Sequence, residues 1–255
     1  MSEKLIDLSH TIEHGLITYK GLPAPIICDF LSREASKKHY APGTQFQIGK
    51  IEMVANTGTY LDSPFHRFED GKDLSELELS SIANLDGVVV SAKGQEQRAK
   101  SQGQSAKSEA SRAEEEMERA IDAKAFEDID VRGKAVLIHT GWSAHWRTDQ
   151  YFEGHPFLTK DAAQFLANEG AALVGIDSYN IDETADLSRP AHSILLGAGI
   201  PIVEHMCNLD ALMQAIDDHP LATASGSVPF NFFAVPVKVK GMGTFPVRAF
   251  AILDH

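Results

Sequence analysis

The second half of this chain alternates short apolar runs with one well-capped helical pattern, and this alternation restricts the folds that it can adopt. Residues 135–139 and 172–177 are apolar runs of strand length. Between them, Thr159 can cap a helix over 160–169, and Gly170 is a typical stop signal after it. A strand, a helix and a strand in this order predict a β-α-β unit with parallel strands and a right-handed crossover.

The chain after this unit predicts two more helices and three more strands. We expect a helix over 190–197, a strand over 200–204, and a helix from an Asn208 cap to about residue 216. Strands over 231–237 and 247–253 follow, and the turn at 241–243 predicts that these two strands form an antiparallel hairpin.

The first half of the chain has weaker signals. Residues 5–8, 48–54 and 87–91 are expected to be strands. The stretch over 11–45 is rich in Gly, Pro and His, and we expect it to be a structured loop. Taken together, these elements predict an α/β fold with a mixed β-sheet and peripheral helices.

A polar tract interrupts this pattern. Residues 92–113 consist largely of Lys, Gln, Ser, Ala, Glu and Arg, and contain no Val, Ile, Leu, Phe or Met. Such a segment cannot bury enough apolar surface to define one conformation. We therefore expect residues 1–255 to form one domain with a polar surface insertion at about 92–120, where Met117 and Ile121 have helical spacing. A linker between two domains is the weaker alternative.

The composition argues against several classes of partner. With 255 residues, of which 43% are hydrophobic, the chain can build a sizeable core. Its net charge of −13 argues against binding to nucleic acids and to anionic membranes. The two cysteines, Cys28 and Cys207, and an amino-terminal segment without an apolar core predict a cytoplasmic protein that has no disulfide framework.

The densest chemistry lies between Asn56 and His66, where the sequence reads N-T-G-T-Y-L-D-S-P-F-H. Asp62 offers an anionic oxygen and His66 an imidazole, which are groups that divalent metals bind. A metal beside an imidazole base can also hydrolyse an unactivated acyl bond. The alternative for an isolated pair of this kind is a simple turn, in which Asp62 caps a backbone amide and His66 lies on the surface.

Two later stretches place polar residues where strands end, which is where α/β proteins bind ligands. Residues 189–204 read R-P-A-H-S-I-L-L-G-A-G-I-P-I-V-E, so that His192 opens a helix and Glu204 ends a strand. Residues 176–182 read I-D-S-Y-N-I-D and contain Asp177 and Asp182. Without a metal, His192 would be a capping residue, Glu204 a buried member of an ion pair, and the two aspartates ordinary loop carboxylates.

These motifs resemble the signature of the metal-dependent cyclase family, which includes kynurenine formamidases and isatin hydrolases and has the pattern H-x-G-T-H-x-D-x-P-x-H. The chain has Asn56 and Tyr60 in place of the two leading histidines. It keeps five positions of the pattern: Gly58, Thr59, Asp62, Pro64 and His66. With the matches at 140–142, 176–182, 189–204 and in the last two strands, the resemblance covers nearly the whole chain except the insertion.

The resemblance implies a metal site and a type of fold. In it, Asp62, His192 and Glu204 are metal ligands, and His66 is the catalytic base. Asp177 and Asp182 shape the loop and orient His192. The resemblance also implies the swivelling β/β/α type of fold, assembled as a homodimer or higher oligomer whose amino-terminal segment crosses between subunits.

Asn56 and Tyr60 change the expected metal content, because the histidines at these positions bind one of the ions in two-metal members of the family. An asparagine oxygen is a weak neutral ligand, and a tyrosine ligates well only as a phenolate, whose formation is opposed by a pKa of about 10. We therefore expect one divalent ion, Zn²⁺ or Mn²⁺, bound by Asp62, His192 and Glu204 with at most weak help from Asn56. Tyr60 is expected to donate a hydrogen bond to the oxyanion.

The expected function is the hydrolysis of a C–N or C–O acyl bond by metal-activated water. The substrate would be a small cyclic or aryl amide, formamide or lactone, and we expect Tyr19 and Phe65 to line its pocket. For Trp142 we expect packing first, with a place in the pocket wall as the alternative. The alternative is a pseudoenzyme that has lost its metal and binds a small molecule or a partner. The replacements at positions 56 and 60 favour this alternative, and the retained acidic and histidine side chains favour the enzyme.

Overall fold

One large sheet organises the chain. The computed structural model describes residues 3–92, 117–219 and 229–254, and within them nine strands join in the order β1-β13-β11-β5-β7-β9-β10-β4-β12. The central strands β5, β7, β9 and β10 run parallel, and antiparallel strands flank them on both sides. Their bounds are β1 Glu3–Asp7, β4 Tyr60–Asp62, β5 Leu85–Ser91, β7 Ala135–His139, β9 Leu173–Ile176, β10 Ile202–Glu204, β11 Phe230–Phe233, β12 Thr244–Pro246 and β13 Phe250–Asp254.

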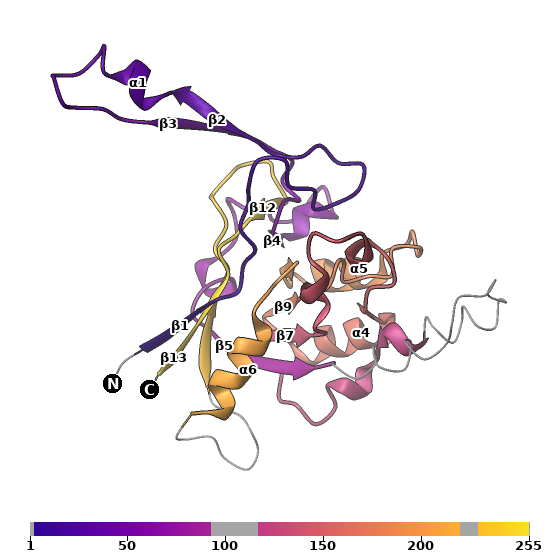
Figure 1. The fold of residues 1–255 in the computed structure, drawn as a ribbon. Helices are drawn as coiled ribbons and strands as arrows, with labels where there is room; N and C mark the ends of the chain where they lie inside the picture. Colours follow the sequence, from indigo (N-terminus) through magenta and orange to yellow (C-terminus); the bar gives the residue numbers. More distant parts are fainter. Residues whose placement is uncertain (1–2, 93–116, 220–228, 255) are drawn as a thin grey trace.

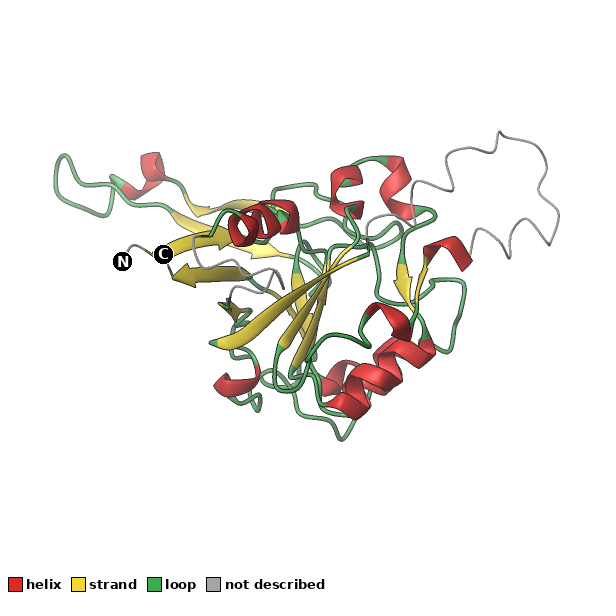
Figure 2. Ribbon diagram, turned by 90° about the horizontal axis from the view of Figure 1, so that it is seen from below, coloured by secondary structure: helices red, strands yellow, loops and turns green. Residues whose placement is uncertain are grey.

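Helices cover the sheet on both faces (Figures 1 and 2). On strand β7, Val136 and Ile138 belong to one apolar cluster together with residues of α4 (Lys160–Glu169) and α5 (Pro190–Gly197). Leu137 points the other way, into a second cluster with residues of α6 (Leu209–Asp217). None of the helices in the described ranges is both long and apolar enough to cross a membrane. The α/β class with a mixed sheet and peripheral helices is therefore confirmed.

The elements with local sequence signals lie where we expected them. Helix α4 spans the predicted residues, the Thr159 side chain accepts a hydrogen bond from the Ala162 amide, and Gly170 ends the helix with a φ of 77°. The strands before and after this helix are parallel neighbours, as the β-α-β unit requires. Helix α5 also matches its predicted range. Asn208 precedes α6 as predicted, but its side chain makes no capping bond and donates instead to the Asp7 carbonyl.

Other predictions were wrong or lie outside the described residues. Strands β11 and β13 pair in antiparallel fashion, but they are not joined by a simple hairpin, because β12 intervenes and pairs with β4 at the far edge of the sheet. Ile121 belongs to the short strand β6 (Ala120–Ile121), which pairs with β8 (Phe157–Leu158), and is not helical. Most of the predicted insertion, residues 93–116, lies outside the described residues. Short helical turns complete the fold: η1 Pro64–His66, η2 Leu79–Ser81, η3 Ala123–Ala125, η4 Trp142–His145 and η5 Asp149–Phe152.

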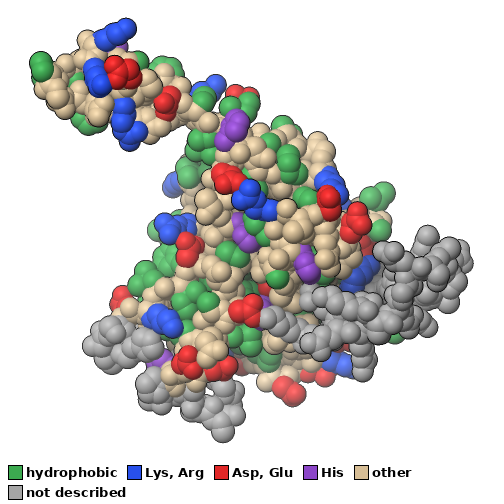
Figure 3. All heavy atoms as spheres, in the orientation of Figure 1, with side chains coloured by type: hydrophobic (Ala, Val, Ile, Leu, Met, Phe, Trp, Pro, Cys, Tyr) green, Lys and Arg blue, Asp and Glu red, His purple; other side chains and the backbone are tan. Residues whose placement is uncertain are grey.

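Residues 11–25 contain no helix or strand, as predicted, but the rest of the predicted loop over 11–45 belongs to an extended arm. Strands β2 (Ile26–Leu31) and β3 (Ile48–Glu52) pair in antiparallel fashion and carry the short helix α1 (Arg33–Ser36) at their far end. The arm projects away from the body of the molecule (Figures 1 and 3). Large apolar side chains on it are exposed, among them Phe30 at 76% and Ile51 at 58%.

One close approach in the sheet gives a test of its packing. A methyl group added at Gly87 of β5 would lie 2.0 Å from Cε2 of Phe230, a ring that is almost fully buried. Because overpacking of this kind typically costs about 1–3 kcal/mol, Gly87→Ala should lower the free energy of unfolding by about that amount. Gly49→Ala, where the added methyl meets nothing within 4 Å, is the matched control. Equal denaturation midpoints for the two variants would contradict the packing described here.

Candidate metal centre and active site

Three neighbouring strands bring the site together. In the antiparallel register, Tyr60 of β4 lies opposite Glu204 of β10, and Asp62 lies opposite Thr244 of β12 on the other side. Because side chains alternate along a strand, Tyr60 and Asp62 share one face of β4. Leu61 points to the opposite face and packs in the α6 cluster. The two-residue spacing of Tyr60 and Asp62 is therefore what directs both side chains into one site.

His192 enters this site from helix α5 and is held there by Asp182. Its Nδ1 lies 2.6 Å from Oδ2 of Asp182, whose carboxylate also accepts the backbone N–H groups of Ala191 and His192. We assign the proton of the neutral ring to Nδ1 from this network. Nε2 then faces the two buried carboxylates, at 3.6 Å from Oδ2 of Asp62 and 3.8 Å from Oε1 of Glu204.

These atoms fit a divalent ion. Oδ2 of Asp62 is buried and has no hydrogen-bond partner, which is costly for a carboxylate oxygen. The separations of 3.6 and 3.8 Å are too long for hydrogen bonds. They are close to the separation of about 3.3–3.4 Å between ligand atoms that tetrahedral bonds of 2.0–2.1 Å to zinc would give. Ligand atoms of Asp62, His66 and His192 also lie within 4.8 Å of one another.

The electrostatics of His192 show that the site favours a positive charge. Burial by itself lowers the pKa of His192, but Glu204, Asp182 and Asp62 outweigh it and raise this pKa to about 10. Metal binding and proton binding compete for the same imidazole nitrogen. A cation bound among these carboxylates would therefore replace the proton that they attract.

Glu204 is already bonded through both of its oxygens. Its Oε1 accepts the Ile181 N–H at 2.6 Å, and its Oε2 accepts the Tyr60 hydroxyl at 2.6 Å. The Tyr19 hydroxyl lies 3.3 Å from the same Oε2 and 2.9 Å from the Tyr60 hydroxyl. Burial and then the charge of Glu204 raise the pKa of Tyr60 well above its usual value, so that the phenol stays neutral.

Tyr60 therefore has a different position from the one expected of an oxyanion donor. Its single proton is directed at Glu204, because the two residues are cross-strand neighbours. A neutral phenol is also unable to ligate a metal as phenolate. Asn56 lines the same cavity. The geometry places the Tyr60 hydroxyl against the outer oxygen of Glu204.

Thr244 is a site residue that the sequence did not reveal. Its hydroxyl donates to Oδ1 of Asp62 and lies 2.7 Å from Nδ1 of His66. Because the hydroxyl proton goes to Asp62, Nδ1 of His66 must be the donor in the second bond, which leaves Nε2 free to accept a proton. The neighbouring Gly243 is also required here, since an added methyl group would lie 2.3 Å from the backbone nitrogen of His66.

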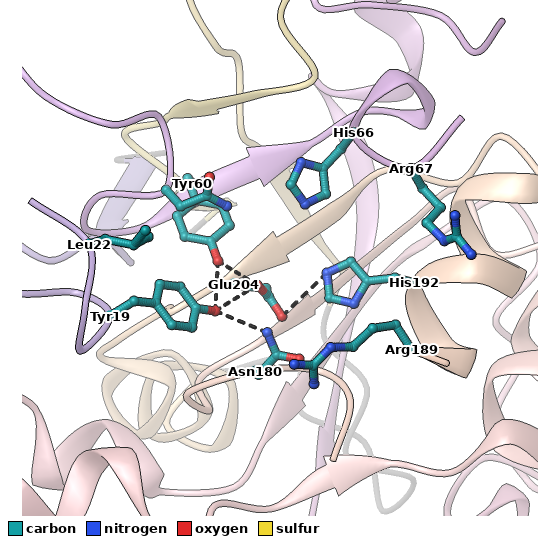
Figure 4. A pocket seen from close by; sticks show the side chains of 10 residues that line it. Tyr19, Leu22, Tyr60, His66, Arg67, Asn180, Arg189, His192 and Glu204 are labelled. Atoms are coloured by element: carbon teal, nitrogen blue, oxygen red, sulfur yellow. Dashed lines mark hydrogen bonds and ion pairs between the residues drawn. The ribbon is translucent and has the colours of Figure 1, made fainter. Parts of the chain in front are cut away.

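A cavity of about 260 Å³ opens onto these groups (Figure 4). The predicted Tyr19 and Asn56 line it together with Leu22, Tyr60, His66, Arg67, Asn180, Arg189, His192 and Glu204. Phe65 is not part of this wall. Trp142 packs with Tyr151 and Tyr179 in a separate aromatic cluster and donates to the Tyr151 carbonyl, so its role in the structure is packing.

Asp177 also lies apart from the position that we expected. Its carboxylate accepts the Thr140 amide and hydroxyl and the Gly141 amide, and it contacts His139 rather than His192. Of the two aspartates expected to orient His192, the structure therefore brings only Asp182 into contact with it. The Thr140–Trp142 stretch is what Asp177 holds in place.

Comparisons with known proteins show the family of this chain. The family described as "Putative cyclase" matches residues 6–183. The kynurenine formamidase of Bacillus cereus is 26% identical over 245 residues, which cover 96% of this chain and 95% of that protein. The kynurenine formamidase of Bacillus anthracis is 25% identical and covers 97% of both chains.

Solved structures share the fold. A potential metal-dependent hydrolase with cyclase activity superposes with a TM-score of 0.69 at 21% identity over the full length of both chains. Isatin hydrolase A from Labrenzia aggregata, solved with benzyl benzoate, superposes with a TM-score of 0.70 at 20% identity, covering 99% of this chain and 94% of that one. Since the family match spans well over half of the residues, this chain belongs to the cyclase family, among whose relatives are metal-dependent hydrolases of amide bonds.

Proposed function

We propose that this protein is a metal-dependent hydrolase that cleaves the acyl C–N or C–O bond of a small cyclic or aryl amide, formamide or lactone. The observation that carries the proposal is the partnerless Oδ2 of Asp62, which lies 3.6 Å from Nε2 of His192 and close to the His66 imidazole. The likeness to kynurenine formamidases supports an amide or formamide as the substrate.

We assign Asp62, His192 and Glu204 as the ligands of one ion, Zn²⁺ or Mn²⁺, with Asn56 at most a weak further ligand. Such an ion would supply a Lewis acid for the carbonyl and would lower the pKa of water towards neutrality. Asp182 keeps the proton of His192 on Nδ1, so that Nε2 can act as a ligand. The phenols of Tyr60 and Tyr19 support Glu204 on its other side.

His66 is the proposed base. Because Thr244 donates its hydroxyl proton to Asp62, Nδ1 of His66 donates to Thr244 and keeps its own proton. Nε2 can then take a proton from the attacking water and deliver it to the leaving nitrogen. The His66 side chain is 35% exposed, which allows contact with a substrate in the cavity. Tyr19 and Leu22 form the opposite wall, against which an aryl ring can pack.

A pseudoenzyme is the second candidate, and one observation favours it. Tyr60 and Tyr19 already satisfy the outer oxygen of Glu204, as they would in a site that had exchanged metal for hydrogen bonds. The partnerless oxygen of Asp62 is unexplained by that alternative. The metal content of the purified protein distinguishes the hydrolase from the pseudoenzyme.

We expect about one zinc or manganese ion per chain in protein purified without chelators, measured by elemental analysis. Removal of the ion should lower the melting temperature, because an ion that binds only the folded state stabilises it. A chain that takes up neither metal, even when each is added in excess, would rule out the hydrolase mechanism and leave the binding protein.

Four variants act as controls for the ligand assignment. Asp62→Asn and Glu204→Ala should lose the ion, whereas His66→Ala should keep it and lose activity. The double variant Asn56→His/Tyr60→His should hold two ions per chain, because it supplies the two imidazoles that this sequence lacks. Retention of the ion in Glu204→Ala together with its loss in His66→Ala would make His66 the third ligand instead.

Substitutions of Thr244 test the proposal that His66 is the base. Thr244→Val removes the hydroxyl that holds His66 while keeping the shape of the side chain. Loss of such a partner typically costs about 10- to 100-fold, so kcat for an arylformamide should fall by about that factor while the metal content is unchanged. Thr244→Ser should restore the rate. In ¹⁵N NMR spectra, the ring of His66 should change from one tautomer to a mixture, and an unchanged spectrum would exclude the role of Thr244.

We also propose that the arm formed by β2 and β3 packs on a second copy of the chain. A two-stranded ribbon is marginal by itself in water, and this one exposes Ile27 and Ile51, which lie opposite each other on one face. A homodimer would cover these side chains.

Cys28 and Cys207 are both free thiols, which is consistent with the cytoplasmic location that we propose.

Light scattering after size exclusion tests this assembly. The wild-type protein should have the mass of a dimer or higher oligomer, and Ile27→Lys/Ile51→Glu should shift it to a folded monomer, because charges would be buried in the contact. Lys50→Gln, on the same arm, is the control and should not change the mass. A monomeric wild-type protein would exclude the proposed contact.

A further inference from the structure

Two arginines stand on one wall of the cavity. Arg67 follows the turn η1 that carries His66, and Arg189 directly precedes helix α5, which carries His192. Figure 4 shows both side chains on the His192 side of the cavity, opposite Tyr19 and Leu22. The cavity thus has an acidic floor, one aromatic and apolar wall, and one cationic wall.

The two guanidinium groups are positioned but not neutralised. Nε of Arg67 donates to the Ser193 hydroxyl at 3.2 Å, and Nη1 of Arg189 donates to the Glu183 carbonyl at 3.1 Å. Each bond uses one of the five N–H donors of a guanidinium group. Both residues line the cavity, and Cζ of Arg67 also lies 5.4 Å from the centroid of the Phe68 ring.

Among the described residues, four other arginines are paired with carboxylates, whereas Arg33 on the arm is not. Arg119 lies 2.7 Å from Glu183, and Arg248 lies 2.9 Å from Asp7. Within the part of the chain that the structure describes, no carboxylate lies within ion-pair distance of Arg67 or Arg189. Arg189 does lower the pKa of Asp186, although the hydrogen bond from Ser188 contributes more. In a chain of net charge −13, two arginines without such a partner at one cavity are a marked departure.

The carboxylates beneath the cavity show why two arginines would matter for ligand binding. Asp62, Asp182 and Glu204 would repel an anionic ligand, and one divalent ion offsets only part of their charge. A neutral amide would need no arginine. A ligand with a carboxylate would, because a guanidinium group binds a carboxylate through two parallel charged hydrogen bonds.

We propose that Arg67 and Arg189 bind a carboxylate carried by the substrate, so that the substrate is an anionic arylamide or arylformamide. Its ring would rest against Tyr19 and Leu22, and its acyl group would lie between His66 and the proposed ligands of the ion. A cavity of about 260 Å³ suits one ring with small substituents. The reaction rests on the proposed function, whereas the recognition of the anion does not depend on it.

Two matched probes, N-formylanthranilate and formanilide, test this proposal because they differ only in a ring carboxylate. For the zinc-loaded protein, kcat/KM should be at least about tenfold higher with N-formylanthranilate, since a hydrogen bond to a charged group contributes at least that factor. Arg67→Gln and Arg189→Gln should each reduce the ratio between the two probes by about tenfold. Arg132→Gln, a change at an exposed arginine paired with Glu169, should leave the ratio unchanged.

Calorimetric titration with 2-aminobenzoate and aniline, which have no acyl bond to cleave, separates recognition from catalysis. The wild-type protein should bind 2-aminobenzoate at least about tenfold more tightly than aniline, and each arginine variant should weaken this preference. Arginine-dependent binding without hydrolysis of either formamide would overturn the proposed function but keep the anion site. Equal turnover of both formamides, or 2-aminobenzoate binding that both arginine variants retain, would overturn the anion site and leave the hydrolase.

Discussion

The burial of two carboxylates on adjacent strands is the constraint on which the rest of this site depends. A carboxylate removed from water without partners is strongly destabilising, and both Asp62 and Glu204 are almost completely buried. The fold meets this cost with hydrogen bonds from the backbone and from side chains: the Ile181 amide and the Tyr60 hydroxyl at Glu204, and the Thr244 hydroxyl at Asp62. One oxygen of Asp62 lacks a partner, and that oxygen faces His192.

The two tyrosines explain how the chain can lack two histidines and still hold the same carboxylates. In a two-ion site, the outer oxygen of Glu204 would face a cation. Here it faces the Tyr60 hydroxyl, with the Tyr19 hydroxyl nearby, and Asn180 in turn donates to Tyr19. Burial and Glu204 raise the pKa of both phenols, so each remains a neutral donor. Neutral donors can satisfy a carboxylate, but they do not replace the Lewis acidity of an ion.

Local patterns in the sequence predicted the local parts of this structure. Helix α4 has a cap, an apolar face and a terminal glycine within twelve residues, so its bounds could be read directly. The motif around Asp62 and the stretch from His192 to Glu204 were equally compact, and the resemblance joined them. Thr244 could not be found in this way, because its role arises only when β12 pairs with β4, some 180 residues earlier in the chain.

The sequence pattern did not predict strand β2 of the arm or which side chains line the cavity, and both failures have one physical cause. Strand β3 falls within the predicted strand over 48–54, whereas β2 was missed, because a strand of an isolated ribbon has no buried face to mark it in the sequence. Trp142 packs with Tyr151 and Tyr179, as its expected packing role requires, but neither its ring nor Phe65 lines the cavity. Which side of a loop faces the cavity is decided by tertiary packing, on which the sequence pattern carries no information.

In a site that holds one ion, protein side chains must do more to orient the substrate. A second ion could help to hold the acyl group, whereas here hydroxyl groups occupy that side of Glu204. Holding a reactant in the geometry of attack contributes several kcal/mol to catalysis, and something must supply that restraint. The cationic wall formed by Arg67 and Arg189 lies across the cavity from Tyr19 and Leu22. A substrate anchored at both walls would have its acyl carbon fixed between His66 and the buried carboxylates, so that the proposed anion recognition would supply the restraint that a second ion would otherwise give.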